Sequence, residues 1–595
     1  MKREYRNPVP FTDGKRRTNP DPYILRWCGK YYCYSTDARG VRVSVSKDLV
    51  NWEDRGYALE DPACKDFWAP SVFYQNGTFY MYYSNIPSDQ SDCHLEHLKL
   101  AVSRNPEKGF QWKKTFFEEF SIDSHPVKWN GRLYMFYSVN NWIGTDERIT
   151  GTCILVDEMK TPEEFSGNPR AVILPTLPQE IYEADRFGDG RDWYTIEGAA
   201  HVVHGNRCWL MYSANAYGNV DYFVGTAVAE NRDDLLDMEW KKYPDPCTWA
   251  PLLCKNDKME GTGHNTVTKA PNLTEDWIVY HGRRAEEKLL PDKEQREMCI
   301  DPLYFSGDRL ICPGPRGGGE APSLPEVSLS QIQTDKRTAL AKGGDFYQTE
   351  LWVSGQQAHY GSRWGILLEY QDENNWFELI VHSGRRELQA VECRGGITRY
   401  LRKVPLEKGY DYTVPHLFQI EKCFEDYTVF VDETELMKIS RKAPFESTLE
   451  LVPHFSLITL HSFAMTRTVR LSGGNLGELG RICQVTPCIA DGEEIQGKEM
   501  PLKLIPECPW ECYTEILQVR PEGHRNCLSF CGNKGRKVLA ESMEKVFSVI
   551  HIVRGTEEIF LVDGKQEGKW ESRTDTSWEY SLEGLAVLEY EVTKN

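Results

Sequence analysis

A short aromatic segment recurs five times in the first half of the 595-residue chain. The copies are KYYCYST (30–36), GTFYMYYSN (77–85), GRLYMFYSV (131–139), NRCWLMYSA (206–214) and DWIVYHG (276–282). Most begin at a turn sequence such as Gln-Asn-Gly or Trp-Asn-Gly, and each is preceded by another short apolar strand, which is typical of a β-hairpin. The repeat predicts an all-β fold with a five-bladed β-propeller. The alternative is a large β-sandwich whose hairpins are similar by chance, but five matched hairpins in order favour the propeller.

One polar or aromatic residue stands at the start of each strand that precedes the repeated segment. These residues are Asp21, Trp68, Asp123, Glu197 and His264. Each lies 13 to 16 residues before the tyrosine that closes the next strand, so the register is nearly constant. In a propeller the innermost strands of all blades begin at one mouth of the central channel. We therefore expect three carboxylates, an imidazole and an indole to share one pocket.

Three carboxylates around one cavity indicate acid–base chemistry. Neighbouring negative charges raise each other's pKa, so one carboxyl can stay protonated near neutral pH while another stays ionised. Cleavage of a glycosidic bond needs this combination, because the leaving oxygen takes a proton and the attacking water loses one. The alternative for any single aspartate or glutamate is a turn or cap residue. Three of them in equivalent positions favour catalysis.

The ordered segments NPDP, FWAPSV, IDSHPV, IEGAAHV and GTGHNTV resemble glycoside hydrolase family 43 over about residues 5–315. This family consists of five-bladed propellers that act mainly on glycans containing arabinose and xylose. The resemblance implies that Asp21 is the general base, that Asp123 orients the acid and adjusts its pKa, and that Glu197 is the general acid. His125 departs from the family pattern, in which a small or apolar residue is commoner.

The resemblance also bears on cofactors. It implies that His264 lies below the sugar site, where it contacts a metal ion or an ordered water. No cofactor is required, and a calcium ion near the propeller centre, with His264 as its ligand, is compatible with the resemblance.

Further residues are candidates for the walls of a sugar pocket. Phe67 and Trp68 are expected to form one wall, and Trp142 and Tyr217 its rim, with packing as the alternative for the last two. Arg283 is expected to donate hydrogen bonds to sugar hydroxyls or to hold Asp123. Its alternative is a solvated arginine at the end of a strand.

A Pro/Gly-rich break, PGPRGGGEAPSLP (313–325), ends the repeated region. Such a composition is typical of a linker or a domain edge. We expect the propeller catalytic domain at 1–320 and a β-sandwich of the jelly-roll or laminin-G-like kind at 321–478. Residues 479–595 are expected to form a second sandwich or an extension of the first, because strand-like runs continue there.

Charge and hydropathy exclude several classes of partner. The chain has 70 Lys and Arg against 89 Asp and Glu, a net charge of −19, which repels nucleic acid. No run reaches the ~18 apolar residues of a membrane helix. The N-terminal residues lack the apolar segment of a secretory signal, so we expect a cytoplasmic protein whose 18 cysteines are reduced.

The function expected from the sequence is that of an inverting exo-glycosidase acting on an oligosaccharide. It would remove terminal α-L-arabinofuranosyl or β-D-xylosyl units. A related propeller glycosidase, such as an exo-galactanase or a fructan hydrolase, is the alternative among enzymes. A glycoside phosphorylase is disfavoured because it needs a basic cluster and no carboxylate base. A non-catalytic glycan-binding protein is the alternative from another class, although it would need no set of three carboxylates.

Overall fold

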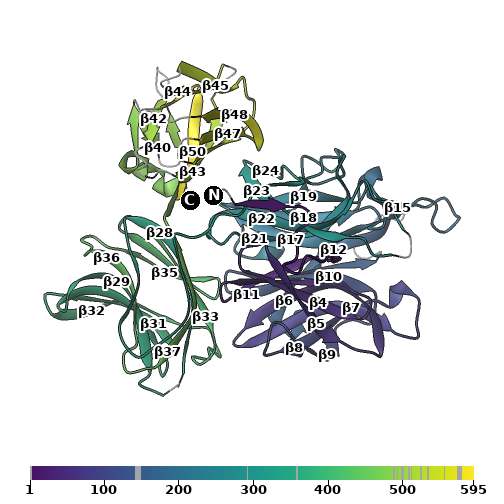
Figure 1. Ribbon diagram of the computed structural model, residues 1–595, viewed down its shortest axis with the longest axis horizontal. Coiled ribbons are helices and arrows are strands. Elements are labelled where there is room, and N and C mark those ends of the chain that lie inside the picture. The colour runs from purple at the N-terminus through teal and green to yellow at the C-terminus, as the bar shows by residue number, and fades with distance from the viewer. Residues whose placement is uncertain are drawn as a thin grey trace. The chain divides into compact units, whose positions relative to one another are not determined.

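The computed structural model describes residues 3–140, 149–290, 293–356, 359–486, 489–491, 494–496, 502–506, 510, 512–522, 525–532, 535–554, 557–571 and 579–595. Its elements are almost all β-strands (Figure 1). The helical elements of the described residues are short 3-10 helices: η1 (Cys93–Leu95), η2 (Pro178–Glu180), η3 (Leu235–Asp237) and η4 (Gly473–Arg481). None of the helices found there is long and apolar enough to cross a membrane. The predicted all-β class is confirmed.

Five sheets follow one another along the first half of the chain, and their strands pair antiparallel except for one short parallel pairing in the third. The first contains β2 (Tyr23–Trp27), β3 (Lys30–Ser35), β4 (Gly40–Ser46) and β5 (Trp52–Glu60). The second contains β6 (Cys64–Gln75), β7 (Thr78–Pro87), β8 (His97–Ser103) and β9 (Gln111–Thr115). The third is built on β10 (Ser121–Trp129), β11 (Arg132–Asn140) and β12 (Thr150–Thr161), with the short strands β13 (Glu164–Phe165), β14 (Arg170–Ile173), β15 (Ile181–Glu183) and β16 (Trp193–Tyr194).

The fourth sheet contains β17 (Ile196–His204), β18 (Arg207–Ala214), β19 (Phe223–Glu230) and β20 (Lys241–Lys242). The fifth contains β21 (Met259–Lys269), β22 (Asp276–Arg284), β23 (Glu297–Ser306) and β24 (Arg309–Ile311). The first strands of the five sheets contact one another in a closed order, β2 to β6, β10, β17, β21 and back to β2. The five sheets therefore surround a common centre, as in a propeller, and we call them the propeller. A short sheet of β1 (Glu4–Arg6) and β25 (Gly318–Glu320) joins its two ends.

The aromatic residues of the repeated segments lie in the cores between neighbouring sheets. Tyr34 and Met81 belong to one such cluster, and Phe136 and Tyr212 to another. Trp277 packs in the cluster that joins the fifth sheet to the first. Burial of each such side chain stabilises the fold by about 1.5–3 kcal/mol. The repeat therefore reflects packing, and it leaves the starts of the inner strands free to carry chemistry.

The inner strands are irregular where the candidate residues stand. The pairing register shifts between Ile122 and His125 in β10 and between Glu197 and Ala200 in β17, and β6 and β21 have similar shifts. Asp21, Asp123 and His264 have positive φ angles of 53°, 58° and 45°. Such bulges bend a strand and turn a side chain away from the regular ladder. Left-handed backbone in non-glycine residues is costly and is concentrated at functional sites.

The second half of the chain folds into further antiparallel sheets. One sheet contains β26 (Val327–Thr334), β28 (Phe346–Gly355), β33 (His416–Cys423), β34 (Asp426–Val431), β35 (Thr434–Ser440) and β37 (Ile458–Thr466). A second contains β27 (Thr338–Lys342), β29 (Arg363–Asp372), β30 (Asn375–His382), β31 (Glu387–Arg394), β32 (Ile397–Pro405) and β36 (Ser447–Val452). Most of these strands belong to the same compact unit as the propeller, which comprises Met1–Pro302, Gly314–Asp345 and Thr349–Met465.

A second compact unit comprises Leu303–Pro313, Phe346–Gln348 and Thr466–Asn595. Its larger sheet contains β38 (Thr468–Ser472), β40 (Ile489–Asp491), β41 (Glu494–Gln496), β43 (Cys512–Pro521), β46 (Phe547–Arg554), β47 (Glu557–Val562), β48 (Lys565–Glu571) and β50 (Leu585–Lys594). The smaller contains β39 (Cys483–Thr486), β42 (Leu502–Pro506), β44 (Cys527–Gly532), β45 (Gly535–Glu541) and β49 (Glu579–Glu583). The domain boundaries expected from the sequence stay a prediction.

Candidate active site

The bulged ends of the inner strands surround one pocket of about 140 Å³. It is lined by all five residues that the constant register selects, Asp21, Trp68, Asp123, Glu197 and His264. These residues come from five different sheets, so the closed ring of sheets is what brings them together. Other lining residues are aromatic, among them Tyr182 and Trp193, and aromatic faces pack well against the apolar faces of sugar rings.

Asp21 is held as an anion. The Arg296 guanidinium lies 3.0 Å from its Oδ1, and the Thr36 hydroxyl donates a hydrogen bond of 2.6 Å to its Oδ2. Burial raises the pKa of Asp21, but Arg296, His264 and His281 outweigh it and hold the pKa well below its ordinary value. Asp21 can therefore accept a proton from a bound water at any ordinary pH.

His281 contacts the backbone of Asp21. Its Nδ1 accepts a hydrogen bond of 3.1 Å from the Asp21 backbone N–H, and its ring stacks on that of Tyr222. Burial lowers the pKa of His281 to about 4, so the ring is neutral near pH 7. The neutral imidazole positions Asp21 through the backbone and leaves the positive charge of the site on Arg296.

Asp123 and Glu197 line the same pocket and lie close to each other. Their carboxylate oxygens and a ring nitrogen of His264 lie within 4.8 Å of one another. Burial and the Glu197 charge raise the pKa of Asp123 well above its ordinary value. Burial raises the pKa of Glu197 to about 7, although the hydrogen bond from the Tyr222 hydroxyl, 2.8 Å long, opposes this. The pair therefore retains a proton near neutral pH while Asp21 does not.

Gly198 allows the two carboxyls to come together. Its backbone N–H donates a hydrogen bond of 3.0 Å to Asp123 Oδ2, and its φ angle of 64° is in the left-handed region. A Cβ atom at this position would stand 3.2 Å from the His264 ring. Glycine suits this position because a side chain would be strained and would press on His264.

His264 lies between the two groups of acids. Its Nδ1 is 3.4 Å from Asp21 Oδ1 and 3.9 Å from Asp123 Oδ2, and burial lowers its pKa. Asp123, Glu197 and His264 are arranged so that they could hold a metal ion. Calcium takes about six to eight oxygen ligands, however, and this group offers two carboxylates and one nitrogen, so it does not fit calcium by itself.

Trp68 lines the pocket, but the expectation that Phe67 forms a wall beside it is wrong. Phe67 is fully buried and stacks on Tyr83 at 5.8 Å in the core between the first two sheets. The physical reason is the alternation of strand side chains, which sends successive residues to opposite faces. Only one of the two neighbours can face the pocket.

The expected rim is present in part. Tyr217 lines the pocket, is 45% exposed and lies with its ring 4.7 Å from the Arg296 guanidinium. Trp142 lies outside the described residues. Arg283 does not hold Asp123 and is not a solvated residue: it is buried and donates to the backbone carbonyls of Tyr217 and Asn219 at 3.2 and 2.9 Å. It fixes the loop that carries Tyr217 and does not line the pocket.

Several residues of the site were missed at the sequence level, among them Arg296, His281 and Tyr222. A signal for His281 was present, because the residue after the closing tyrosine is serine in four repeats and histidine in the fifth. Arg296 lies just before the third strand of its sheet and Tyr222 just before the third strand of the fourth sheet. Neither stands at the repeated position, so the pattern gave no reason to select them.

Comparisons with known proteins identify relatives of this chain. An extracellular exo-alpha-(1->5)-L-arabinofuranosidase of Streptomyces avermitilis is 23% identical over 317 residues, which cover 50% of this chain and 62% of that protein. A beta-xylosidase of Bacillus subtilis is 23% identical over 355 residues, which cover 52% of this chain and 58% of that protein. The match thus spans less than two thirds of the length of these two relatives.

Among solved structures, a thermostable family-43 glycoside hydrolase is 32% identical, with a TM-score of 0.45, over 54% of this chain and 99% of that one. The model of glycosyl hydrolases family 43 matches residues 5–311. This match covers just over half of the chain and includes every described residue of the pocket. The chain therefore belongs to glycosyl hydrolases family 43.

Proposed function

We propose that the protein is an inverting exo-glycosidase that removes terminal α-L-arabinofuranosyl or β-D-xylosyl units from oligosaccharides. The observation that carries the proposal is the different surroundings of the carboxyls in one pocket: Asp21 pairs with Arg296 at 3.0 Å, whereas Asp123 and Glu197 lie close to each other. Asp21 is ionised beside Arg296, and the pair of Asp123 and Glu197 holds a proton. The names of the two relatives, an arabinofuranosidase and a xylosidase, support the choice of sugars.

In the proposed reaction Asp21 takes a proton from a water molecule, and the oxygen of that water attacks the anomeric carbon. The bond between that carbon and the leaving oxygen breaks, and Glu197 gives its proton to the leaving oxygen. Asp123 is proposed as a positioning residue. Its Oδ2 accepts a hydrogen bond from the Gly198 N–H, which opposes the rise in its pKa, and it shares with Glu197 the proton that Glu197 delivers. Proton exchange with solvent then restores both carboxyls.

The size of the pocket supports action at a chain end. Its volume of about 140 Å³ is below the ~300–1,000 Å³ typical of pockets that bind larger ligands. A pocket of this size suits a single terminal sugar unit. A panel of nitrophenyl glycosides (arabinofuranoside, xyloside and galactoside) together with a fructoside donor tests the sugar. Absence of turnover on all of them and on natural oligosaccharides would leave glycan binding without catalysis.

The stereochemical outcome is the second expected result. A water activated by Asp21 attacks from the face opposite the leaving group, so the first sugar formed should carry the inverted anomeric configuration. Proton NMR at early times, before mutarotation, measures this. Retained configuration, or transfer of the sugar to added methanol, would contradict single displacement.

The pH dependence follows from the raised pKa of Glu197 and the lowered pKa of Asp21. The raised pKa of Glu197, about 7, means that the acid is protonated below this pH and is lost as pH rises through it. We expect kcat/KM to fall tenfold per pH unit well above pH 7, and no loss near pH 4–5 because the pKa of Asp21 is lowered. Tyr222→Phe removes a hydrogen bond that stabilises ionised Glu197, so the basic limb should move to higher pH. An unchanged limb in Tyr222→Phe would contradict the assignment.

A further inference from the structure

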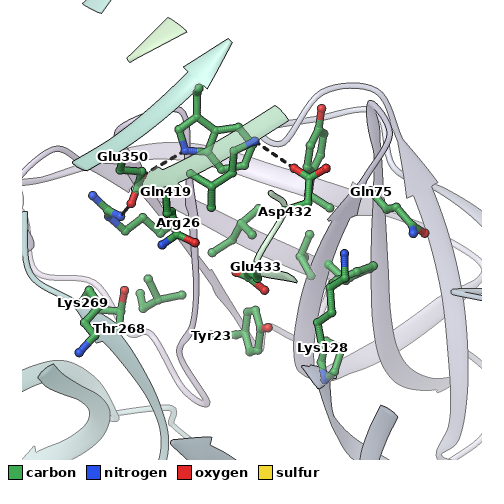
Figure 2. Close-up of a pocket in the computed structure, with 18 of the residues that line it drawn as sticks. Tyr23, Arg26, Gln75, Lys128, Thr268, Lys269, Glu350, Gln419, Asp432 and Glu433 are labelled. Atoms are coloured by element: carbon green, nitrogen blue, oxygen red, sulfur yellow. Dashed lines mark hydrogen bonds and ion pairs between the residues drawn. The ribbon is translucent and has the colours of Figure 1, made fainter. Parts of the chain in front are cut away.

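A second cavity, of about 310 Å³, lies at the other ends of four of the same inner strands (Figure 2). Lys128 follows Asp123 by five residues on β10, and Lys269 follows His264 by five residues on β21. At about 3.3 Å per residue these two lysines lie ~17 Å along the strands from the catalytic groups, whereas the lining residue Tyr23 is only two residues from Asp21. No residue lines both pockets.

Strands β28 and β33 and the turn between β34 and β35 form the other wall of this cavity. They belong to the same compact unit as the propeller. The wall is fixed by direct contacts: the Tyr74 hydroxyl donates a hydrogen bond of 2.8 Å to the Pro415 carbonyl, and Arg26 forms an ion pair with Glu350. The cavity is therefore preformed and needs no rearrangement to exist.

The cations around the cavity already have partners. Arg26 pairs with Glu350, Lys128 with Glu407 at 3.2 Å, and Lys269 with Asp276 at 2.8 Å. Asp432 is likewise engaged, because its Oδ2 lies 2.6 Å from His416 Nδ1. With these charges balanced, the described lining residues offer no unpaired cation for an anionic ligand.

Four polar side chains face the cavity and make no hydrogen bond or ion pair with the described residues. They are the Tyr23 and Thr268 hydroxyls, the Gln419 amide and the Glu433 carboxylate, and Figure 2 shows them around the same space, with Glu433 near Tyr23. Glu433 lines the cavity and is exposed. Polar groups in such a setting are costly unless a water or a ligand satisfies them.

The set of free groups matches a ligand rich in hydroxyls. A carboxylate can accept hydrogen bonds from two adjacent hydroxyls, an amide both donates and accepts, and the two protein hydroxyls can do either. The remaining lining includes apolar and aromatic side chains such as Leu25, Phe73 and Trp352, which suit the C–H faces of a sugar ring. The volume is about twice that of the catalytic pocket.

We propose that this cavity is a second, non-catalytic binding site for a neutral saccharide of one or two sugar units. The free carboxylate of Glu433 and the amide of Gln419 bind its hydroxyls, and the aromatic lining contacts its apolar face. This site goes beyond the proposed hydrolysis and does not depend on it, because no catalytic group lines it.

The test uses the full chain with Glu197→Gln, so that bound saccharides are not consumed. Calorimetric titration with L-arabinose, D-xylose and their β- or α-linked disaccharides should show two classes of site for at least one of these sugars. Adding Glu433→Gln or Gln419→Ala should weaken one class at least tenfold and leave the other within twofold. Glu435→Gln, an exposed residue on β35 outside the cavity, is the matched control and should change neither class.

The outcomes of this experiment distinguish failure of the second site from failure of the proposed hydrolysis. Binding at a single class of site, unaffected by Glu433→Gln and Gln419→Ala, would overturn the proposal, and so would binding of none of these sugars outside the catalytic pocket. Trp68→Ala should weaken only the class that Glu433→Gln leaves intact. Failure of the glycoside panel with a site that still responds to Glu433→Gln would reject hydrolysis and keep the second site.

Discussion

Replacing Glu197 by Gln should lower turnover on oligosaccharides by about 10²–10⁴-fold, the usual contribution of a general acid. Gln keeps the shape of the side chain and can still accept the hydrogen bond from Tyr222, but it has no proton to give. A nitrophenolate leaving group needs little protonation, so on activated nitrophenyl glycosides the loss should be ~tenfold or less. The basic limb of the pH profile should also disappear.

Steady-state kinetics on both kinds of substrate measure this difference. Glu230→Gln, an exposed residue at the far end of β19 in the same sheet, is the control and should keep the wild-type rates. Equal losses on good and poor leaving groups would assign Glu197 a role other than proton donation. Wild-type rates in a folded Glu197→Gln protein would remove it from the mechanism.

Asp21→Asn should lose about 10²–10⁴-fold on both kinds of substrate, because activation of water is needed whatever group leaves. The change also leaves the buried Arg296 guanidinium without one of its two carboxylates, while Glu294 remains 2.7 Å away. Breaking a buried ion pair can cost about 3–5 kcal/mol, so circular dichroism and thermal unfolding must accompany the kinetics.

Rescue by azide distinguishes loss of the catalytic base from unfolding of the Asp21→Asn protein. Azide is a nucleophile that needs no deprotonation, so it should restore activity on activated substrates in Asp21→Asn and give a glycosyl azide of inverted configuration. Asp257→Asn, at an exposed position before β21, is the matched control. Absence of rescue in a folded Asp21→Asn protein, or a loss confined to poor leaving groups, would contradict the role of Asp21 as base.

Much of the architecture could be predicted because the packing is periodic. Five aromatic segments recur since each must fill a core between neighbouring sheets, as Tyr34 and Tyr212 do. The constant offset from these tyrosines located Asp21, Asp123, Glu197 and His264, and all four line the pocket. Phe67 was misplaced because the motif did not reveal which of two adjacent residues faces inward.

The protonation pattern could not be read from the repeat. It depends on Arg296, which lies 275 residues from Asp21 and outside the repeated positions, and on Tyr222, which reaches Glu197 from the loop before another strand. The second cavity likewise needs β28, β33 and the β34–β35 turn against the propeller. The repeat is enough to predict that Asp21, Asp123, Glu197 and His264 meet at one end of the ring, because strand periodicity fixes direction and register. Their charges depend on the folded structure, because a pKa depends on burial and on partners that chain order does not bring together.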